Sequence, residues 1–155
     1  MAQPGDARVA RGLPLDLGNF AGRRVYVHLP DGFSYRAWLK GLKSGRSFVT
    51  TGPMLFVECP THEVRGTVLS ESPVPSVEIV LNGVVHTRAL TPRRNTEGAW
   101  EAHFREPVRV PGTHWVAVRC FEPRPADRFR FAHTAPFWFE VPDQPLKPRR
   151  AEAEF

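Results

Sequence analysis

The sequence predicts a mainly β fold, an Ig-like antiparallel β-sandwich preceded by one short helix and a strand. Short apolar runs alternate with polar residues, and turn residues separate these runs at intervals of about ten residues. The chain of 155 residues holds 16 Pro and 12 Gly, a content that favours turns over long helices. Eleven Phe and four Trp in a chain that is 41% hydrophobic supply bulky side chains for one core.

One segment has helical periodicity. It predicts a helix over residues 35–44, whose apolar positions are Tyr35, Trp38, Leu39 and Leu42. The hydroxyl of Ser34 is suited to cap the amino end of this helix, and Gly45 is suited to end it.

Strands are expected around this helix. Their predicted ranges are 25–29, 46–51 and 54–58. Gly52-Pro53 is expected to form the turn that separates the second of these strands from the third. Further along, the alternation predicts strands over residues 76–81, 84–90, 99–104, 114–121 and 131–141. Asn82-Gly83 is a strong signal for a two-residue hairpin turn. We expect the inward side chains of these strands to be Val77, Ile79, Leu81, Trp100, Ala102, Phe104, Val116, Val118, Cys120, Phe137, Phe139 and Val141.

These elements divide the chain into four parts. Residues 1–18 are expected to be a flexible lead-in, and residues 19–60 a strand–helix–strand segment. The sandwich domain is expected over residues 61–142, followed by a mobile charged tail over residues 143–155.

The net charge of +5 comes mainly from arginines that are spread along the chain. This distribution is typical of a solvated basic surface, and we expect no nucleic-acid partner because no basic helix or aromatic stacking platform stands out. The sequence shows no signal peptide and no transmembrane segment. We therefore expect no membrane partner and, by default, a cytoplasmic protein.

The residues that perform chemistry do not form a recognisable catalytic pattern. None of the six His makes the close His pair that is typical of metal sites, and Cys59-x-x-His62 alone is a weak signal. No Ser stands in a nucleophile elbow, and Cys59 and Cys120 are expected to be buried, inert thiols. We predict no catalytic residue, no metal ligand and no cofactor in this chain.

One stretch is more distinctive than any of these motifs. Residues 33–39 and 41–53 run Phe-Ser-Tyr-Arg-Ala-Trp-Leu and Gly-Leu-Lys-Ser-Gly-Arg-Ser-Phe-Val-Thr-Thr-Gly-Pro. With residues 77–83, 115–121 and 131–136, this stretch resembles the C-terminal part of the CehA/McbA-type metallohydrolases, in the polymerase-and-histidinol-phosphatase (PHP) superfamily. The resemblance covers residues 19–142 and implies a hydrolase parent in which a sandwich-like region follows a metal-binding barrel.

Two departures from that family matter. Thr51 stands where the family usually has Asn. The family binds divalent metal through His-x-His and Asp-x-His motifs, and neither motif occurs in this chain. The resemblance therefore transfers no metal ligand, and it implies that the barrel core is missing.

The leading hypothesis is a non-catalytic accessory domain, present as a truncated or split product, that packs against a PHP-type barrel. Residues expected at the rim of that barrel's site are Thr50, Thr51, Gly52 and His133. A simple strand turn is the more common interpretation of the Thr50–Pro53 segment, and a purely structural role is likewise the more common interpretation of His133. The interface, or a surface for self-association, is expected on the helix at Tyr35, Trp38, Leu39 and Leu42.

Two other functions stay open. The first is a carbohydrate- or protein-binding sandwich that uses surface Arg and the strand residues Trp100, Trp115 and Trp138, for which core packing is the simpler interpretation. The second is an enzyme whose site is assembled by oligomerisation.

Overall fold

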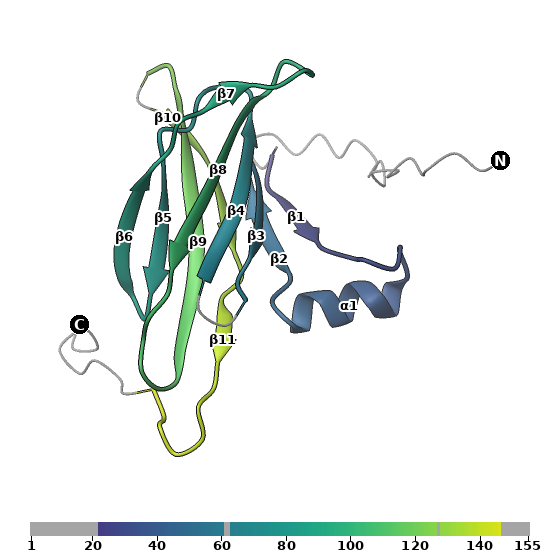
Figure 1. The fold of residues 1–155 in the computed structure, drawn as a ribbon. Helices are drawn as coiled ribbons and strands as arrows, with labels where there is room; N and C mark the ends of the chain where they lie inside the picture. The colour runs from purple at the N-terminus through teal and green to yellow at the C-terminus, as the bar shows by residue number, and fades with distance from the viewer. Residues whose placement is uncertain (1–21, 61–62, 127, 147–155) are drawn as a thin grey trace.

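The computed structural model describes residues 22–60, 63–126 and 128–146. These residues form two antiparallel β-sheets and one helix, which confirms the predicted β-sandwich (Figure 1). In chain order the elements are β1 (Arg24–Val27), α1 (Tyr35–Lys43), β2 (Ser47–Thr50), β3 (Met54–Glu58), β4 (Glu63–Ser70), β5 (Ser76–Leu81), β6 (Val84–Ala89), β7 (Arg93–Arg94), β8 (Trp100–Pro107), β9 (His114–Arg124), β10 (Arg128–Thr134) and β11 (Phe137–Phe139).

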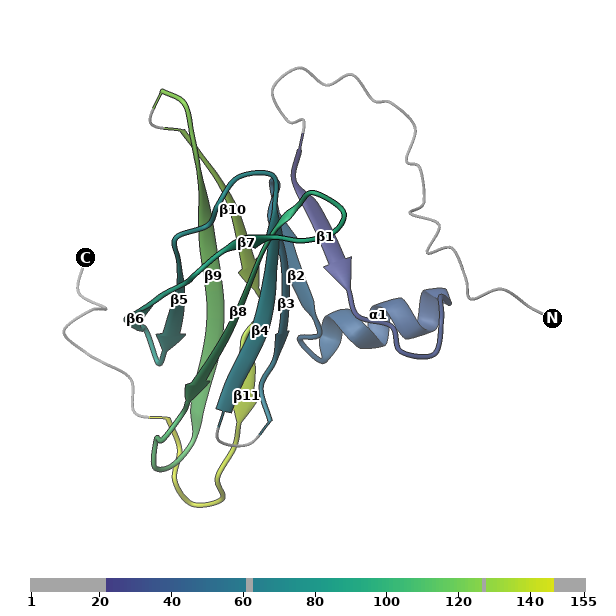
Figure 2. The ribbon, with the colours of Figure 1, turned by 45° about the horizontal axis from the view of Figure 1, so that its top comes forward.

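The two sheets have different sizes. The larger, sheet A, has the strand order β1-β2-β10-β9-β5-β6, and β11 pairs with the end of β9. The smaller, sheet B, has the order β3-β4-β8-β7. Figure 2 shows the two layers facing each other, with β2 and β3 on the side from which β1 and α1 extend.

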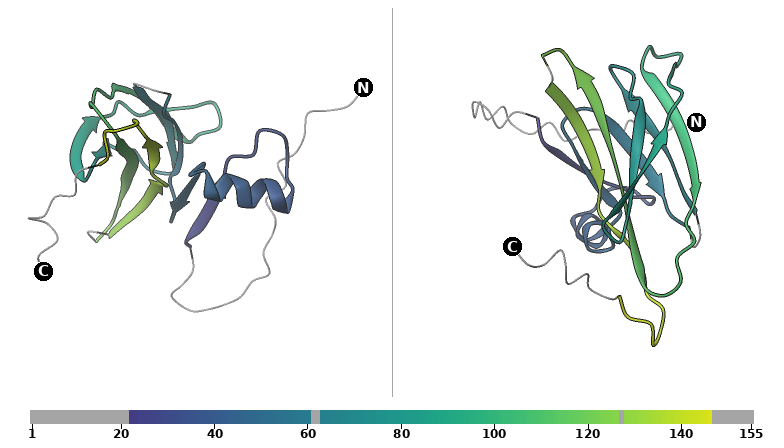
Figure 3. Two further views of the ribbon diagram at one scale, coloured as in Figure 1. Left: turned by 90° about the horizontal axis from the view of Figure 1, so that it is seen from below. Right: turned by 90° about the vertical axis from the view of Figure 1, so that its left-hand side faces the viewer.

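Helix α1 lies within a β-hairpin. Strands β1 and β2 pair antiparallel, with Arg24 opposite Thr50 and Val27 opposite Ser47. The predicted cap is present, because the hydroxyl of Ser34 accepts a hydrogen bond from the amide of Ala37 at 3.1 Å. The helix ends one residue earlier than expected, at Lys43, and it lies beside the sandwich rather than on a sheet face (Figure 3).

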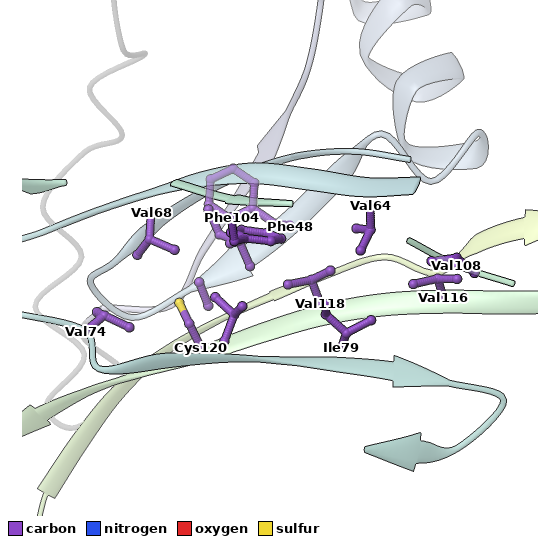
Figure 4. Packing of buried hydrophobic residues seen from close by; sticks show 13 residues of the cluster. Phe48, Val64, Val68, Val74, Ile79, Phe104, Val108, Val116, Val118 and Cys120 are labelled. Carbon is purple, nitrogen blue, oxygen red and sulfur yellow. The ribbon is translucent and has the colours of Figure 1, made fainter. Parts of the chain in front are cut away.

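The core lies between the sheets, where side chains from both layers point toward one another (Figure 4). The predicted inward positions of β9 are fully buried at Val116, Val118 and Cys120. Sheet B contributes Leu55 from β3 and Phe104 from β8. Alternation therefore identified the buried face of β5, β8 and β9. The other residues predicted to point inward are only half-buried, namely Leu81, Trp100, Phe137, Phe139 and Val141, and Val141 lies beyond the end of β11.

The strand predicted over residues 131–141 is two strands. Strand β10 ends at Thr134 and β11 begins at Phe137, and the break falls at Ala135-Pro136 because Pro has no N–H to donate to a ladder. Strand β9 extends past its predicted end at residue 121 to Arg124, since it pairs with β10 over that length.

The expected boundary after residue 60 runs through the β3–β4 hairpin. Strand β3 pairs with β4 across it, and β2 pairs with β10 in sheet A. Residues 47–58 are therefore part of the sandwich rather than of a separate segment.

The two expected terminal segments are only partly described. The lead-in at residues 1–18 and residues 147–155 of the tail lie outside the described residues. The start of the tail is anchored rather than loose, because the carbonyl of Gln144 accepts a hydrogen bond from the amide of Thr113 at 3.1 Å.

Candidate functional site

The turn between β2 and β3 contains three of the predicted rim residues. Thr50 is 2% exposed, and its hydroxyl accepts a hydrogen bond from the amide of Gly52 at 2.9 Å and donates one to the carbonyl of Pro53 at 2.5 Å. Pro53 is itself fully buried. Both hydrogen bonds of the Thr50 hydroxyl are thus made within the turn, so this hydroxyl stabilises the backbone of the β2–β3 connection.

The neighbouring threonine connects the turn to β10. The hydroxyl of Thr51 accepts a hydrogen bond from the amide of Phe131 at 2.9 Å, and the amide of Thr51 donates to the carbonyl of Phe131, also at 2.9 Å. Thr51 therefore satisfies both backbone groups of a residue 80 positions away in the chain. This is a structural use of the residue that stands where the resembled family has Asn.

Gly52 covers a buried carboxylate. A Cβ at residue 52 would lie 2.4 Å from Cδ of Arg130 and 3.2 Å from Oε2 of Glu122. Glu122 has no solvent exposure, and its Oε1 accepts a hydrogen bond from the amide of Ser72 at 2.8 Å. Its Oε2 is buried without a hydrogen-bond partner. The backbone of Gly52 fits here because it has no side chain.

Two arginines, Arg124 and Arg130, each lie close to the buried carboxylate of Glu122 and to the exposed carboxylate of Glu71. Nη1 of Arg130 lies 2.6 Å from Oε2 of Glu71 and 4.0 Å from Oε2 of Glu122. Arg124 lies 3.3 Å from Glu71 and 3.5 Å from Glu122. The hydrogen bond from Arg130, together with the charges of Arg130 and Arg124, lowers the pKa of Glu71 from its ordinary value.

Sequence reasoning missed Glu122, although a signal was present. The inward alternation of β9 passes through Val116, Val118 and Cys120 and reaches Glu122 at the next inward position. A carboxylate at a position where the pattern predicts an apolar side chain is the type of exception that marks a buried ionic network.

A small cavity of about 340 Å³ adjoins this network. Its lining includes the predicted residues Thr50, Thr51 and Gly52, and it also includes Glu71 and Arg130. His133 does not line it. That side chain belongs to the outer face of sheet A, where His133 stands opposite Val49 and Arg119 in the neighbouring strands. The structure therefore brings together three of the four predicted rim residues.

The predicted interface residues lie on α1. Tyr35 is 70% exposed and stacks on Trp38 with ring centroids 6.3 Å apart, and Phe33 just before the helix is 81% exposed. Trp38, Leu39 and Leu42 are half-buried. Gly41 is the one buried residue of the helix, and it lies against Val27 of β1.

Two of the three strand tryptophans meet on the outer face of sheet A. Trp138 of β11 stands opposite Trp115 of β9, with ring centroids 6.5 Å apart, and Trp138 is 58% exposed. Arg119, four residues further along β9 than Trp115, pairs with Glu78 at 2.5 Å and lies over the ring of Phe121. The third tryptophan, Trp100, is half-buried in sheet B, with the guanidinium of Arg94 over its ring.

The cysteines are free thiols. Burial raises the pKa of Cys120 to about 12 and that of Cys59 to about 11. His62, the other member of the Cys59-x-x-His62 pair, lies outside the described residues. Across residues 22–60, 63–126 and 128–146, no group of three or more His, Cys, Asp or Glu side chains is placed to hold a metal ion. In the same ranges, α1 is far too short to span a bilayer.

Comparison with known proteins adds no family to this description. No protein-family model, no curated protein and no solved structure matches the chain.

Proposed function

We propose that this chain is a non-catalytic accessory β-sandwich domain that packs through α1 and β1 against a second protein domain. The single observation behind the proposal is the position of α1. The helix lies beside the sandwich, its buried residue is Gly41, and the aromatic rings at Phe33 and Tyr35 are mostly exposed.

The short length of α1 favours a further domain that packs against it. A helix of nine residues is too short to be stable in water without tertiary contacts. Two lysines in its last turn, Lys40 and Lys43, favour it through the helix dipole, but such terms amount to about 1 kcal/mol or less each. Burial of Tyr35, Trp38, Leu39 and Leu42 by another domain would supply the larger hydrophobic contribution.

Strand β1 extends the same surface. It is the end strand of sheet A, and its Val25 is 56% exposed. A partner that covers α1 therefore also meets an exposed valine and an edge of β1 that no other strand among the described residues pairs with. The resemblance to the CehA/McbA-type metallohydrolases suggests which partner this is, namely a PHP-type barrel whose own residues bind the metal.

Co-expression tests the proposal. A metal-binding barrel of that family, without its C-terminal region, is co-expressed with this chain and purified by a tag on the barrel. We expect a one-to-one complex with the unsubstituted chain and its loss in a Tyr35→Ser, Trp38→Ser double variant. Phe129→Ser is the matched control, since Phe129 is 63% exposed on β10 and is not part of the α1 surface.

Two results contradict the proposal. One is the absence of a complex with any barrel of the family while the chain alone is a stable monomer. The other is one equivalent of zinc or manganese that the purified chain retains through dialysis, because that metal would show a centre of its own.

A second candidate function rests on the paired tryptophans. Trp115 and Trp138 offer two aromatic faces on the outer side of sheet A, an arrangement suited to stacking against a sugar ring. A change in tryptophan fluorescence on addition of a polysaccharide, lost in Trp138→Ala and kept in Tyr35→Ser, would favour carbohydrate binding.

A further inference from the structure

A groove of about 790 Å³ runs along β3 and is lined by residues of β1 and β2 in sheet A and of β3, β4 and β8 in sheet B. Its walls include Tyr26 of β1, Phe48 of β2 and Phe56 of β3. We propose that this groove binds an extended, acidic segment of a partner protein, which pairs with β3 as an added strand of sheet B. The groove shares Tyr26 and Val27 of β1 with the proposed interface, but none of Tyr35, Trp38, Leu39 and Leu42 lines it. Binding in the groove can therefore be tested separately from the α1 surface.

The edge of β3 is available for pairing. In the part of the chain that the structure describes, β3 is the end strand of sheet B and pairs on one side with β4. An end strand presents a row of unpaired N–H and C=O groups, which an extended peptide can satisfy. Five residues of β3 give a pairing edge of roughly 17 Å.

The end strands of this sandwich differ in how they are protected. Strand β7, at the opposite end of sheet B, consists of Arg93 and Arg94. Strand β6, at one end of sheet A, carries Arg88 and His86. Strand β3 begins with four uncharged residues, Met-Leu-Phe-Val, before it reaches Glu58. Charged residues on edge strands discourage pairing with other chains, and β3 lacks this protection along most of its length.

The groove lies away from the turn that joins β2 to β3, because no residue of that turn lines it. The tight turn at residues 51–53 joins β2 to β3, and the hydrogen bonds of Thr50 hold that turn together. Residues from the far part of each strand line the groove, at Ser47 and Phe48 on β2 and at residues 55–58 on β3. The groove therefore runs along the edge of β3 over residues 55–58.

An aromatic wall gives the groove places for apolar side chains. Tyr26 and Phe48 are stacked with centroids 5.2 Å apart, and Phe48 meets Phe56 edge to face at 6.0 Å. Phe48 is buried, but Phe56 is 48% exposed in the middle of the unprotected strand. An added strand that places alternate apolar side chains against these rings would cover Phe56.

The charges of the groove select an acidic occupant. Its charged lining consists of Arg46, Arg65, Arg105 and one carboxylate, Glu58, and His28 and His103 also line it. Arg65 pairs with Glu58 at 2.7 Å, and Arg105 pairs with Glu63 at 2.9 Å. Among the described residues, no carboxylate lies within ion-pair distance of Arg46, whose Nε donates to the hydroxyl of Ser44. A carboxylate on the added strand would complement Arg46.

Synthetic peptides test this inference. The probe is a capped peptide of about eight residues with alternating Val and Glu, compared with a peptide in which Lys replaces each Glu. We expect saturable binding of the acidic peptide, with the largest amide chemical-shift changes at residues 54–58, and at least about tenfold weaker binding of the basic one. A third peptide with Pro at alternate positions should not bind, because it lacks the N–H groups that pair with β3.

Two variants connect the binding to the groove. Arg46→Glu should reverse the preference between the acidic and the basic peptide. Phe56→Ser should weaken the acidic peptide by about tenfold or more. Arg93→Glu and Phe129→Ser are the matched controls, one charge and one exposed aromatic residue on other strands, and both should bind as the unsubstituted chain does.

Three outcomes would overturn the inference. The first is equal binding of the acidic and the basic peptide, and the second is chemical-shift changes confined to residues outside the groove. The third is a dimer of this chain that dissociates in Phe56→Ser, because it would show that a second copy of the chain pairs with the edge of β3. Tyr35→Ser, Trp38→Ser should leave peptide binding unchanged. Failure of the peptide test therefore does not contradict the accessory-domain proposal. Failure of the co-expression test likewise does not contradict peptide binding in the groove.

Discussion

The carboxylate of Glu122 is fully buried in β9, with its Oε2 4.0 Å from Nη1 of Arg130 on the neighbouring strand β10. A buried charge is tolerated only when other charges and hydrogen bonds compensate for its lost hydration. The amide of Ser72 and the guanidinium groups of Arg124 and Arg130 provide that compensation. The turn at Gly52 completes the enclosure.

Removal of Arg130 should destabilise the fold more than an ordinary surface substitution does. Arg130→Ala leaves Glu122 buried with a weaker counter-charge, so we expect a loss of about 3 kcal/mol in the free energy of unfolding. Urea denaturation measures it. Arg88→Ala is the control, because Arg88 forms an exposed pair with Glu106 at 3.7 Å and should cost less than about 1 kcal/mol. Equal effects of the two substitutions would refute the buried network.

Substitution of Gly52 should act through the same network. In Gly52→Ala the new methyl group meets Cδ of Arg130 at 2.4 Å and its Cβ at 3.1 Å, so either the turn or Arg130 must move. We expect a loss of about 1–3 kcal/mol, which is typical of overpacking. The double variant Gly52→Ala, Arg130→Ala should be less destabilised than the sum of the single variants. Strict additivity, measured by the same denaturation, would show that the contact is unimportant.

Glu71, the exposed carboxylate of the network, should make the stability of the fold depend on pH in the acidic range. The pKa of Glu71 is lower in the folded chain than its ordinary value of 4.5. Its contribution is therefore present above that ordinary value and is lost as the pH falls through the lower, folded value. The difference in Tm between the unsubstituted chain and Glu71→Gln should shrink below about pH 4.5, and it should also shrink in high salt. A difference that does not depend on pH would contradict the ion pair with Arg130.

The buried thiol of Cys120 and the half-buried thiol of Cys59 should produce the opposite dependence at alkaline pH. The pKa values of Cys59 and Cys120 rise from 9.0 to about 11 and about 12. Their contribution is complete below pH 9.0 and is lost as the pH rises through the folded values, because the unfolded thiols ionise first. Cys120→Ser should reduce the decline in Tm above pH 9, although the hydroxyl itself lowers stability. Rapid reaction of Cys120 with a disulfide reagent in the native state would contradict its burial, whereas Cys59 is only half-buried.

The fold was predictable from the sequence where contacts follow local alternation. The periods of β5, β8 and β9 identified the core, and the Ser34 cap identified the start of α1. Strand β4 was harder to recognise because Gly66 interrupts its pattern. The reason for that glycine lies in another strand, since a Cβ there would be 2.8 Å from the ring of Phe104.

The candidate site was predictable only in part. The Gly52-Pro53 motif directed attention to the correct turn, but the roles of its residues depend on Phe131 and Arg130, which are distant in sequence. Non-local pairing of this kind leaves no periodic signal in the turn itself. His133 was grouped with the turn on resemblance alone, and the register of β10 assigns it to the opposite face of sheet A.

The antiparallel ladder between β1 and β2 continues to the amide of His28, which donates to the carbonyl of Arg46 at 2.9 Å. The seventeen residues from Leu29 to Gly45, α1 included, thus leave and re-enter a hairpin that a two-residue turn would close equally well. A chain with Asn-Gly in place of this insert should therefore keep its sandwich. The segment that contains α1 can therefore be replaced as a unit. Another recognition element can be inserted between His28 and Arg46 without redesign of the core.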